Sequence, residues 1–124
     1  MSQILIVDDQ PVIRRLLSVT LGTEYEILEA EDGLGALEAI RRHHPRVVLL
    51  DVMMPGAMDG LQVLDAIKGD PLTRDILVAI VTARGQAADG DDARQRGADA
   101  YFIKPFSPRQ VLAWVRSKLG PSQA

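Results

Sequence analysis

Acidic residues stand at the ends of two apolar runs in this sequence. Asp8 and Asp9 directly follow the run Gln3–Val7. Asp51 directly follows the run Val47–Leu50. Two carboxylates about 4 Å apart repel each other by about 4 kcal/mol at an effective dielectric near 20, so three together need a cation or protons. Oxygen donors that leave room for water and a phosphate suit Mg²⁺ better than Ca²⁺, and Mn²⁺ is a possible substitute.

Two further functional groups follow later apolar runs. Thr82 ends the run Ile76–Val81, and Lys104 ends the run Ala100–Ile103. A metal beside a free carboxylate, an amine and a hydroxyl provides the nucleophile, the neutralising charge and the donors that phosphoryl transfer requires. If the fold brings these groups together, the product would be an aspartyl phosphate on Asp51.

Each of these residues alone also has an ordinary structural explanation. Aspartates cap helices and turns, threonine favours strands, and a lysine is usually a solvated charge. The set is more informative than its members, because every relevant strand end carries a group that this one mechanism needs. We therefore favour the functional interpretation of the set.

The order of the apolar patterns predicts an α/β fold. Five short runs typical of strands alternate with five segments of helical periodicity, which indicates βαβ units and a parallel sheet. We expect strands at 3–7, 25–30, 47–50, 76–81 and 100–103, and helices near 11–21, 34–44, 61–69, 86–97 and 108–119. Right-handed crossovers give a doubly wound, flavodoxin-like sheet of order 2-1-3-4-5, in which the first and third strands are neighbours.

Two of these elements should differ from the others. The second strand is more polar, which places it at a sheet edge. The fourth helix contains Gly90 and the acids Asp89, Asp91 and Asp92, which have poor helix propensity, so we expect it to be short or mobile.

Composition limits the classes of function. The 124 residues suit one domain, which we assign to 1–120, with 121–124 as a tail or the start of a linker. A net charge of −3 argues against direct nucleic-acid binding, and the absence of cysteine excludes disulfides and thiol catalysis. No run is long enough to span a membrane, and no signal peptide precedes the first strand, so we expect a cytoplasmic protein without a membrane partner.

Five short segments carry a family resemblance when they occur together and in this order. They are Val7–Asp9, Leu50–Pro55, Met58–Gly60, Val81–Ala83 and Tyr101–Phe106. Together they resemble the receiver domain of two-component response regulators over nearly the whole chain. The resemblance implies that Asp51 is the phosphoacceptor. It also implies that Asp9, Asp51 and the backbone carbonyl of Met53 bind Mg²⁺, with Asp8 helping directly or through water.

The resemblance also assigns roles around the phosphoryl group. It implies that Lys104 pairs with the phosphate and that Met53 and Ala83 contribute to phosphate binding. Thr82 would be the switch hydroxyl, and Tyr101 the aromatic side chain that turns inward behind it. The Lys104–Pro105 peptide is usually cis in such domains.

These assignments predict a signalling switch. A histidine kinase or phosphotransfer protein would supply the phosphoryl group, and the face formed by the fourth helix, fifth strand and fifth helix would bind a downstream protein. We expect a monomer or a phosphorylation-dependent dimer. We do not expect an enzyme, apart from self-catalysed phosphorylation and dephosphorylation.

Alternatives remain open. The chain could be the receiver fragment of a larger multidomain regulator or hybrid kinase, or a phosphate-independent binding scaffold. An aspartate-nucleophile phosphatase would be expected to carry a second Asp at position 53, where this chain has Met. A flavin-binding module would need a phosphate-cradling loop after the first strand, and two aspartates there would repel phosphate.

Overall fold

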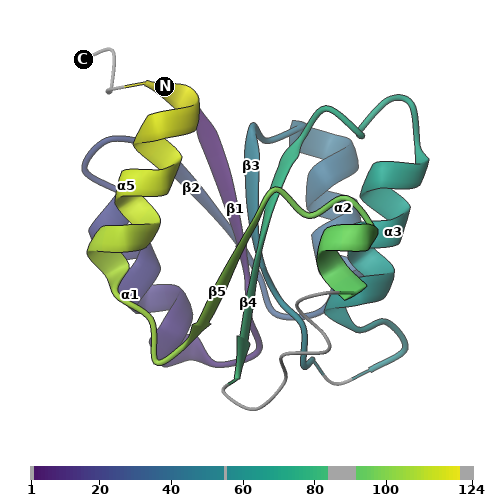
Figure 1. The fold of residues 1–124 in the computed structure, drawn as a ribbon, viewed down its shortest axis with the longest axis horizontal. Helices are drawn as coiled ribbons and strands as arrows, with labels where there is room; N and C mark the ends of the chain where they lie inside the picture. The colour runs from purple at the N-terminus through teal and green to yellow at the C-terminus, as the bar shows by residue number, and fades with distance from the viewer. Residues whose placement is uncertain (1, 55, 84–91, 121–124) are drawn as a thin grey trace.

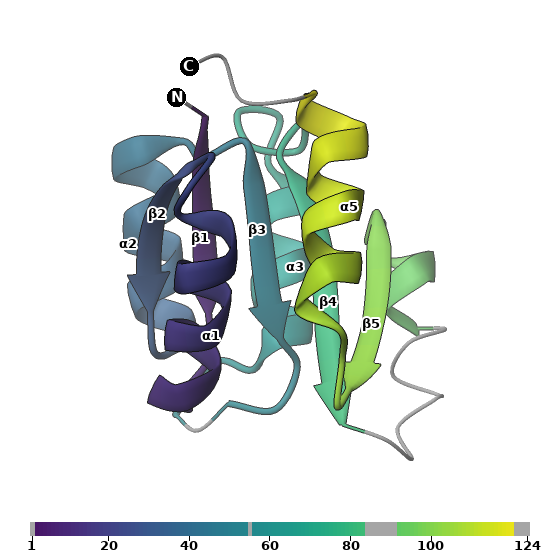
Figure 2. The same ribbon diagram turned by 90° about the vertical axis from the view of Figure 1, so that its left-hand side faces the viewer.

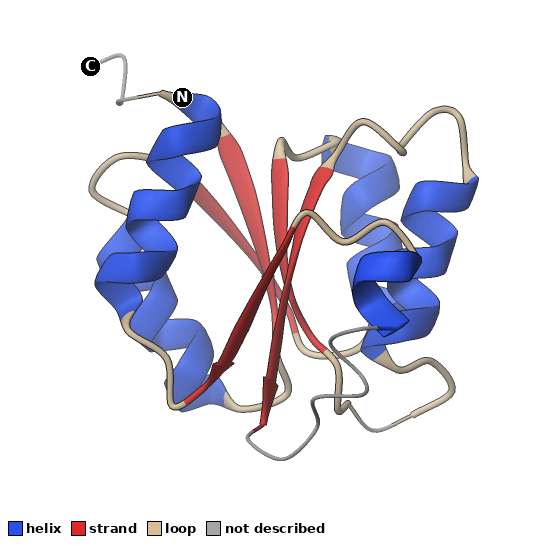
Figure 3. Ribbon diagram, in the orientation of Figure 1, coloured by secondary structure: helices blue, strands red, loops and turns tan. Residues whose placement is uncertain are grey.

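A single parallel sheet organises the chain (Figure 1 and Figure 3). The computed structural model describes residues 2–54, 56–83 and 92–120. The strand order is β2-β1-β3-β4-β5, which confirms the predicted topology and the edge position of β2. The strands are β1 (Gln3–Val7), β2 (Glu26–Ala30), β3 (Val47–Asp51), β4 (Leu77–Ala83) and β5 (Ala100–Lys104).

Helices cover both faces of the sheet, as in a doubly wound fold. Figures 1 and 2 show α1 and α5 on one face and α2 and α3 on the other. The bounds are α1 (Pro11–Leu21), α2 (Gly33–His43), α3 (Gly60–Gly69) and α5 (Pro108–Leu119). Of the predicted fourth helix, residues 92–95 are helical, and 86–91 lie outside the described residues. Within the described part of the chain, no helix is both long and apolar enough to cross a membrane.

Side-chain caps lie at the starts of three of these helices, α2, α3 and α5. The Ser107 side chain accepts a hydrogen bond from the backbone of Gln110, and Pro108 follows at the first helical position. Asp59 and Gln62 form a reciprocal capping box at the start of α3. Such caps satisfy first-turn N–H groups that have no partner inside the helix. This capping box lies where the chain that leaves β3 after Asp51 enters α3.

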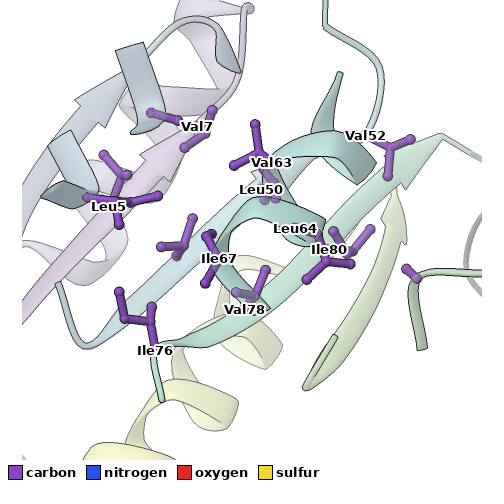
Figure 4. Packing of buried hydrophobic residues seen from close by; sticks show 14 of the residues in the cluster. Leu5, Val7, Leu50, Val52, Val63, Leu64, Ile67, Ile76, Val78 and Ile80 are labelled. Carbon is purple, nitrogen blue, oxygen red and sulfur yellow. The ribbon is translucent and has the colours of Figure 1, made fainter. Parts of the chain in front are cut away.

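The strands alternate their side chains between two hydrophobic clusters. Leu5, Leu50 and Ile80 belong to the cluster beneath α2 and α3, which Figure 4 shows. Ile4 and Leu49 belong to the cluster beneath α1 and α5. Every residue of β3 is buried, so this strand is covered on both faces, as its uninterrupted apolar run predicts. A rigid central strand therefore presents Asp51 at its end.

Four strands differ from their predicted limits: β3 and β5 each end one residue later, and β2 and β4 differ at their starts. β2 begins at Glu26, because the backbone N–H of Tyr25 donates to Leu21 in the turn after α1. β4 begins at Leu77, because the N–H of Ile76 donates to Thr73. At its other end β4 continues through Ala83, which pairs in register with Lys104 of β5.

Candidate functional site

Three carboxylates meet at the carboxyl edge of the sheet. Asp8, Asp9 and Asp51 each offer one oxygen, and these oxygens lie within 4.8 Å of one another. The register explains the meeting, because Val7 pairs with Leu50 and an aspartate directly follows each of these two residues. Asp8 and Asp51 are only 2% and 4% exposed, whereas Asp9 is exposed. The prediction that these three residues come together is confirmed.

Lys104 brings a positive charge to the carboxylates. Its Nζ lies 3.0 Å from Asp8 Oδ2 and 3.7 Å from Asp51 Oδ2, and it also contacts Gln10 Oε1 at 3.3 Å. Neighbouring strands lie about 4.8 Å apart, so the lysine of β5 must extend past the end of β4 to reach these acids. One ammonium group thus faces two nearly buried carboxylates.

Burial raises the pKa of Asp51 to about 6. The negative charge of Asp8 adds to this rise, and Asp9 contributes in the same direction. Lys104 and the backbone N–H of Met53, which donates to Asp51 Oδ1 at 3.3 Å, lower the pKa but do not offset the burial. At neutral pH Asp51 is therefore mostly ionised, and this ionisation lowers the folding stability. A bound cation would reduce that loss.

Backbone hydrogen bonds hold the acidic loop between β1 and α1. The N–H of Asp8 donates to the carbonyl of Ala30, and the N–H of Gln10 donates to Asp8 Oδ1. Arg14 Nη1 donates to the carbonyl of Asp8 at 2.8 Å. Neither Gln10 nor Arg14 was among the residues predicted for the site. Arg14 and Arg15 are adjacent and alike in type, and only the phase of α1 decides which of them turns toward the loop.

Thr82 and Tyr101 lie on the same face of the sheet. In the β4–β5 register Ile80 pairs with Tyr101 and Thr82 with Ile103, and Ile80 faces the cluster beneath α2 and α3. Thr82 is fully buried, and Tyr101 packs partly against this cluster. The guanidinium of Arg94 lies over the Tyr101 ring, 5.4 Å from its centroid. The two predicted switch residues are thus diagonal neighbours behind the acidic edge.

The donor set fits a hard divalent cation. All three converging groups are carboxylates, which are the ligands that Mg²⁺ and Mn²⁺ prefer. An open pocket beside Asp9, lined also by Glu31, Asp32 and Gly56, adds further negative charge to the rim. Asp8, Asp9 and Asp51 are the residues that could hold the ion, and the Met53 carbonyl stays a predicted ligand. Ala83 lies at the same edge, level with Lys104, and its phosphate contact also stays a prediction.

Fold and site together define a flavodoxin-like domain with an acidic, lysine-bearing centre at the topological switch point. The sequence of residues 4–116 matches the family model of the response regulator receiver domain. The chain belongs to this family, and its resemblance to receiver domains is confirmed. The Lys104–Pro105 peptide is cis, as that resemblance implies.

Relatives include longer regulators. The chain is 42% identical over 118 residues to the probable transcriptional regulator ycf27 of Cyanophora paradoxa, a match that covers 94% of this chain and 48% of that protein. It is 40% identical over 117 residues to the phosphate regulon transcriptional regulatory protein PhoB of Pseudomonas aeruginosa, covering 94% and 51%. The chain thus spans about half the length of the curated relatives it matches.

Solved structures show the same fold. A putative response regulator from Chloroflexus aurantiacus matches with a TM-score of 0.88 and 31% identity, covering 95% of this chain and 97% of that one. The receiver domain of NtrX from Brucella abortus matches with a TM-score of 0.87 and 33% identity, covering 94% and 97%.

Proposed function

We propose that this domain is a signalling switch and that Asp51 is its phosphoacceptor. A histidine kinase or phosphotransfer protein would phosphorylate it. The observation that carries this proposal is the nearly buried Asp51 carboxylate, with Asp8, Asp9 and Lys104 converging on it. In the reaction one Asp51 oxygen attacks the phosphorus of a phosphohistidine. The bond from phosphorus to the donor imidazole nitrogen breaks, and the electron pair stays on that nitrogen.

Asp8, Asp9 and Asp51 would hold Mg²⁺, or Mn²⁺, with the carbonyl of Met53 as a further ligand. When bound, the ion supplies positive charge to the phosphoryl oxygens during transfer. Lys104 supplies a second positive charge, and its contact with Asp8 keeps the ammonium group beside the acceptor. The backbone N–H groups of Met53 and Ala83 would donate to the remaining oxygens, since both residues lie at this edge.

The switch would run through the neighbouring strand pair. Phosphorylation adds about −1.5 to −2 charges and three acceptor oxygens beside Lys104 and Thr82. A hydroxyl that turns toward these oxygens vacates space on the face it shares with Tyr101, and the ring can then turn inward. The result is a changed surface across residues 92–95, β5 and α5, which a downstream protein reads.

The surface beside the site favours a protein as phosphoryl donor. Val12, Leu16 and Val19 of α1 are 76%, 42% and 68% exposed, and their spacing places them along one side of the helix. α1 begins directly after the acidic loop, so a protein that reached Asp51 could cover this stripe. Exposed apolar side chains of this kind mark protein contact surfaces.

The family and the net charge of the chain support a proposal for where the switch acts and what it contacts. We place the domain in the cytoplasm, as a monomer or a phosphorylation-dependent dimer that does not itself contact nucleic acid. Its relatives are about twice its length, so its output can reside in a segment beyond this chain. Its only catalysis would be its own phosphorylation and dephosphorylation.

Intact-mass measurement after incubation with acetyl phosphate tests the proposal. Wild type should gain one phosphoryl group only when Mg²⁺ is present, and Asp51→Asn should gain none. Asp75→Asn is the matched control, because that carboxylate is 73% exposed and lies away from the site. An adduct that persists in Asp51→Asn would refute the acceptor assignment. No adduct in wild type, even with a phosphohistidine donor, would favour a phosphate-independent scaffold.

A further inference from the structure

Arg14 connects the acidic loop to the edge strand of the sheet. Its Nη1 donates to the carbonyl of Asp8 at 2.8 Å, and its Nε donates to Glu29 Oε1 at 3.2 Å. The side chain is only 17% exposed, although it is charged. A planar guanidinium that binds two acceptors at once holds a fixed geometry, which a single ammonium group does not.

These contacts act on one peptide group in particular. The N–H of Asp8 is bound directly to Ala30 of β2, and the carbonyl of Asp8 is bound through Arg14 to Glu29 of the same strand. This carbonyl belongs to the peptide that joins Asp8 to Asp9, so its orientation sets where the Asp9 side chain starts. Asp9 is exposed and lacks the burial that holds Asp8 in place.

We infer that Arg14 is a positioning residue of the metal site. By fixing the Asp8–Asp9 peptide, it aims both carboxylates at Asp51 before any ion binds. The inference rests on the proposed divalent-cation site and adds a residue outside the ligand set. Partners of this kind, one step removed from the ion, typically change metal affinity 10-fold to 100-fold when they are lost.

Charge and position predict opposite effects for Arg14. Arg14 is a cation close to a site that binds a cation, so removal of its charge alone should tighten metal binding. Loss of the positioning hydrogen bonds should instead weaken it. Arg15 separates the two effects, because it is the neighbouring arginine on α1 and its side chain is exposed.

The test measures binding of Mn²⁺ alone, by the loss of the free-ion electron paramagnetic resonance signal, in Arg14→Met, Arg14→Lys and Arg15→Met. We expect Arg14→Met to bind about tenfold more weakly than wild type. Arg15→Met should bind as wild type or slightly more tightly. Arg14→Lys should fall between wild type and Arg14→Met, since one ammonium group can reach the Asp8 carbonyl without also holding Glu29. Metal-free melting curves of each variant show whether it is folded.

Each outcome decides between explanations. Equal or tighter binding by Arg14→Met would overturn the inference, and so would a lower metal-free melting temperature with unchanged affinity, which is the signature of a purely structural residue. If Arg14→Met fails to fold, Arg14→Lys carries the test, and wild-type affinity in that variant would overturn the inference. No Mn²⁺ binding by wild type would overturn the metal site itself, a different result from failure of the Arg14 role.

Discussion

The carboxyl edge of the sheet, where the strands end, and the amino edge, where they begin, differ in how their charged side chains are paired. At the carboxyl edge Asp8, Asp9 and Asp51 converge, and Lys104 pairs with Asp8 and Asp51. At the amino edge the Lys68 ammonium donates to the carbonyls of Ile76 and Arg74, at 2.7 and 3.2 Å, and to Asp99 Oδ2 at 3.0 Å. Asp99 also accepts the backbone N–H of Val78. At the amino edge Lys68 and Asp99 pair with each other, whereas among the described residues the three acids that converge at the carboxyl edge outnumber the lysine that pairs with them.

The charged groups at the amino edge therefore stabilise the fold, whereas those at the carboxyl edge serve the proposed function. Paired and hydrogen-bonded charges at the amino edge hold the turns before β4 and β5 in place. At the carboxyl edge the ionised, buried Asp51 costs stability, and a ligand that supplies positive charge recovers part of it. Substitutions at the two edges should therefore change the free energy of unfolding in opposite directions.

The largest expected effect is a gain of stability when Asp51 loses its charge. The folded-state pKa of about 6 lies above the ordinary value of 3.8, so the group favours folding fully below that ordinary value and loses this contribution as pH rises through 6. The difference corresponds to about 3 kcal/mol near pH 8. Metal-free Asp51→Asn should exceed wild type in unfolding free energy by this order near pH 8 and by little near pH 4, as urea denaturation measures.

Addition of Mg²⁺ sharpens this prediction. The ion should raise the melting temperature of wild type near pH 8 and raise that of Asp51→Asn much less. Asp75→Asn serves again as the control, with a wild-type response to both pH and metal. A metal-free Asp51→Asn that is no more stable than wild type would show that neither burial nor the neighbouring carboxylates make the ionisation of Asp51 costly.

A smaller effect of opposite sign is expected at the amino edge. Lys68→Met should lower the unfolding free energy by about 2 kcal/mol, because the ammonium group is only partly exposed and its loss leaves acceptors unpaired. Lys118→Met removes the same charge from an exposed position of α5 and should change stability little. Urea denaturation at neutral pH measures both variants. Phosphorylation of Lys68→Met by acetyl phosphate should stay normal, and its loss would mean that the two edges are not independent.

The smallest effect concerns one hydrogen bond at the amino edge. Tyr25 is 3% exposed, and its hydroxyl donates to the carbonyl of Gly120 at the end of α5. Tyr25→Phe keeps the ring and removes this bond, so the unfolding free energy should fall by about 1 kcal/mol. The shift in urea midpoint measures it. An unchanged midpoint would show that the Tyr25 hydroxyl does not stabilise the fold. A changed Mg²⁺ affinity would show that the amino edge influences the carboxyl edge.

Local patterns explain why so much of the fold could be predicted. The apolar run Val47–Leu50 indicated a buried central strand, and the polar residues 25–30 indicated an edge strand. With right-handed crossovers these features predicted the observed sheet order, in which the residues that follow Val7 and Leu50 are neighbours. β2 and β4 begin one residue later than predicted, because the N–H groups of Tyr25 and Ile76 form turn hydrogen bonds. Such bonds depend on neighbouring backbone and not on hydrophobic periodicity.

The site could be predicted less completely than the fold. Residue type indicated the acids and Lys104, but the role of Arg14 depends on helix phase and on a backbone carbonyl as acceptor. The Lys68 network was also missed, because two of its three acceptors are main-chain carbonyls that any sequence provides. The raised pKa of Asp51 follows from burial, which depends on the packed structure.

The most direct test of the costly ionisation of Asp51 is a measurement of the pKa of its carboxyl group. Carbon-13 NMR of the side-chain carboxyl can follow its titration with and without Mg²⁺. The structure predicts a metal-free value of about 6 and a marked fall when Mg²⁺ is added. A value near the ordinary 3.8 that does not respond to Mg²⁺ would contradict both the costly ionisation of the buried Asp51 and the metal site.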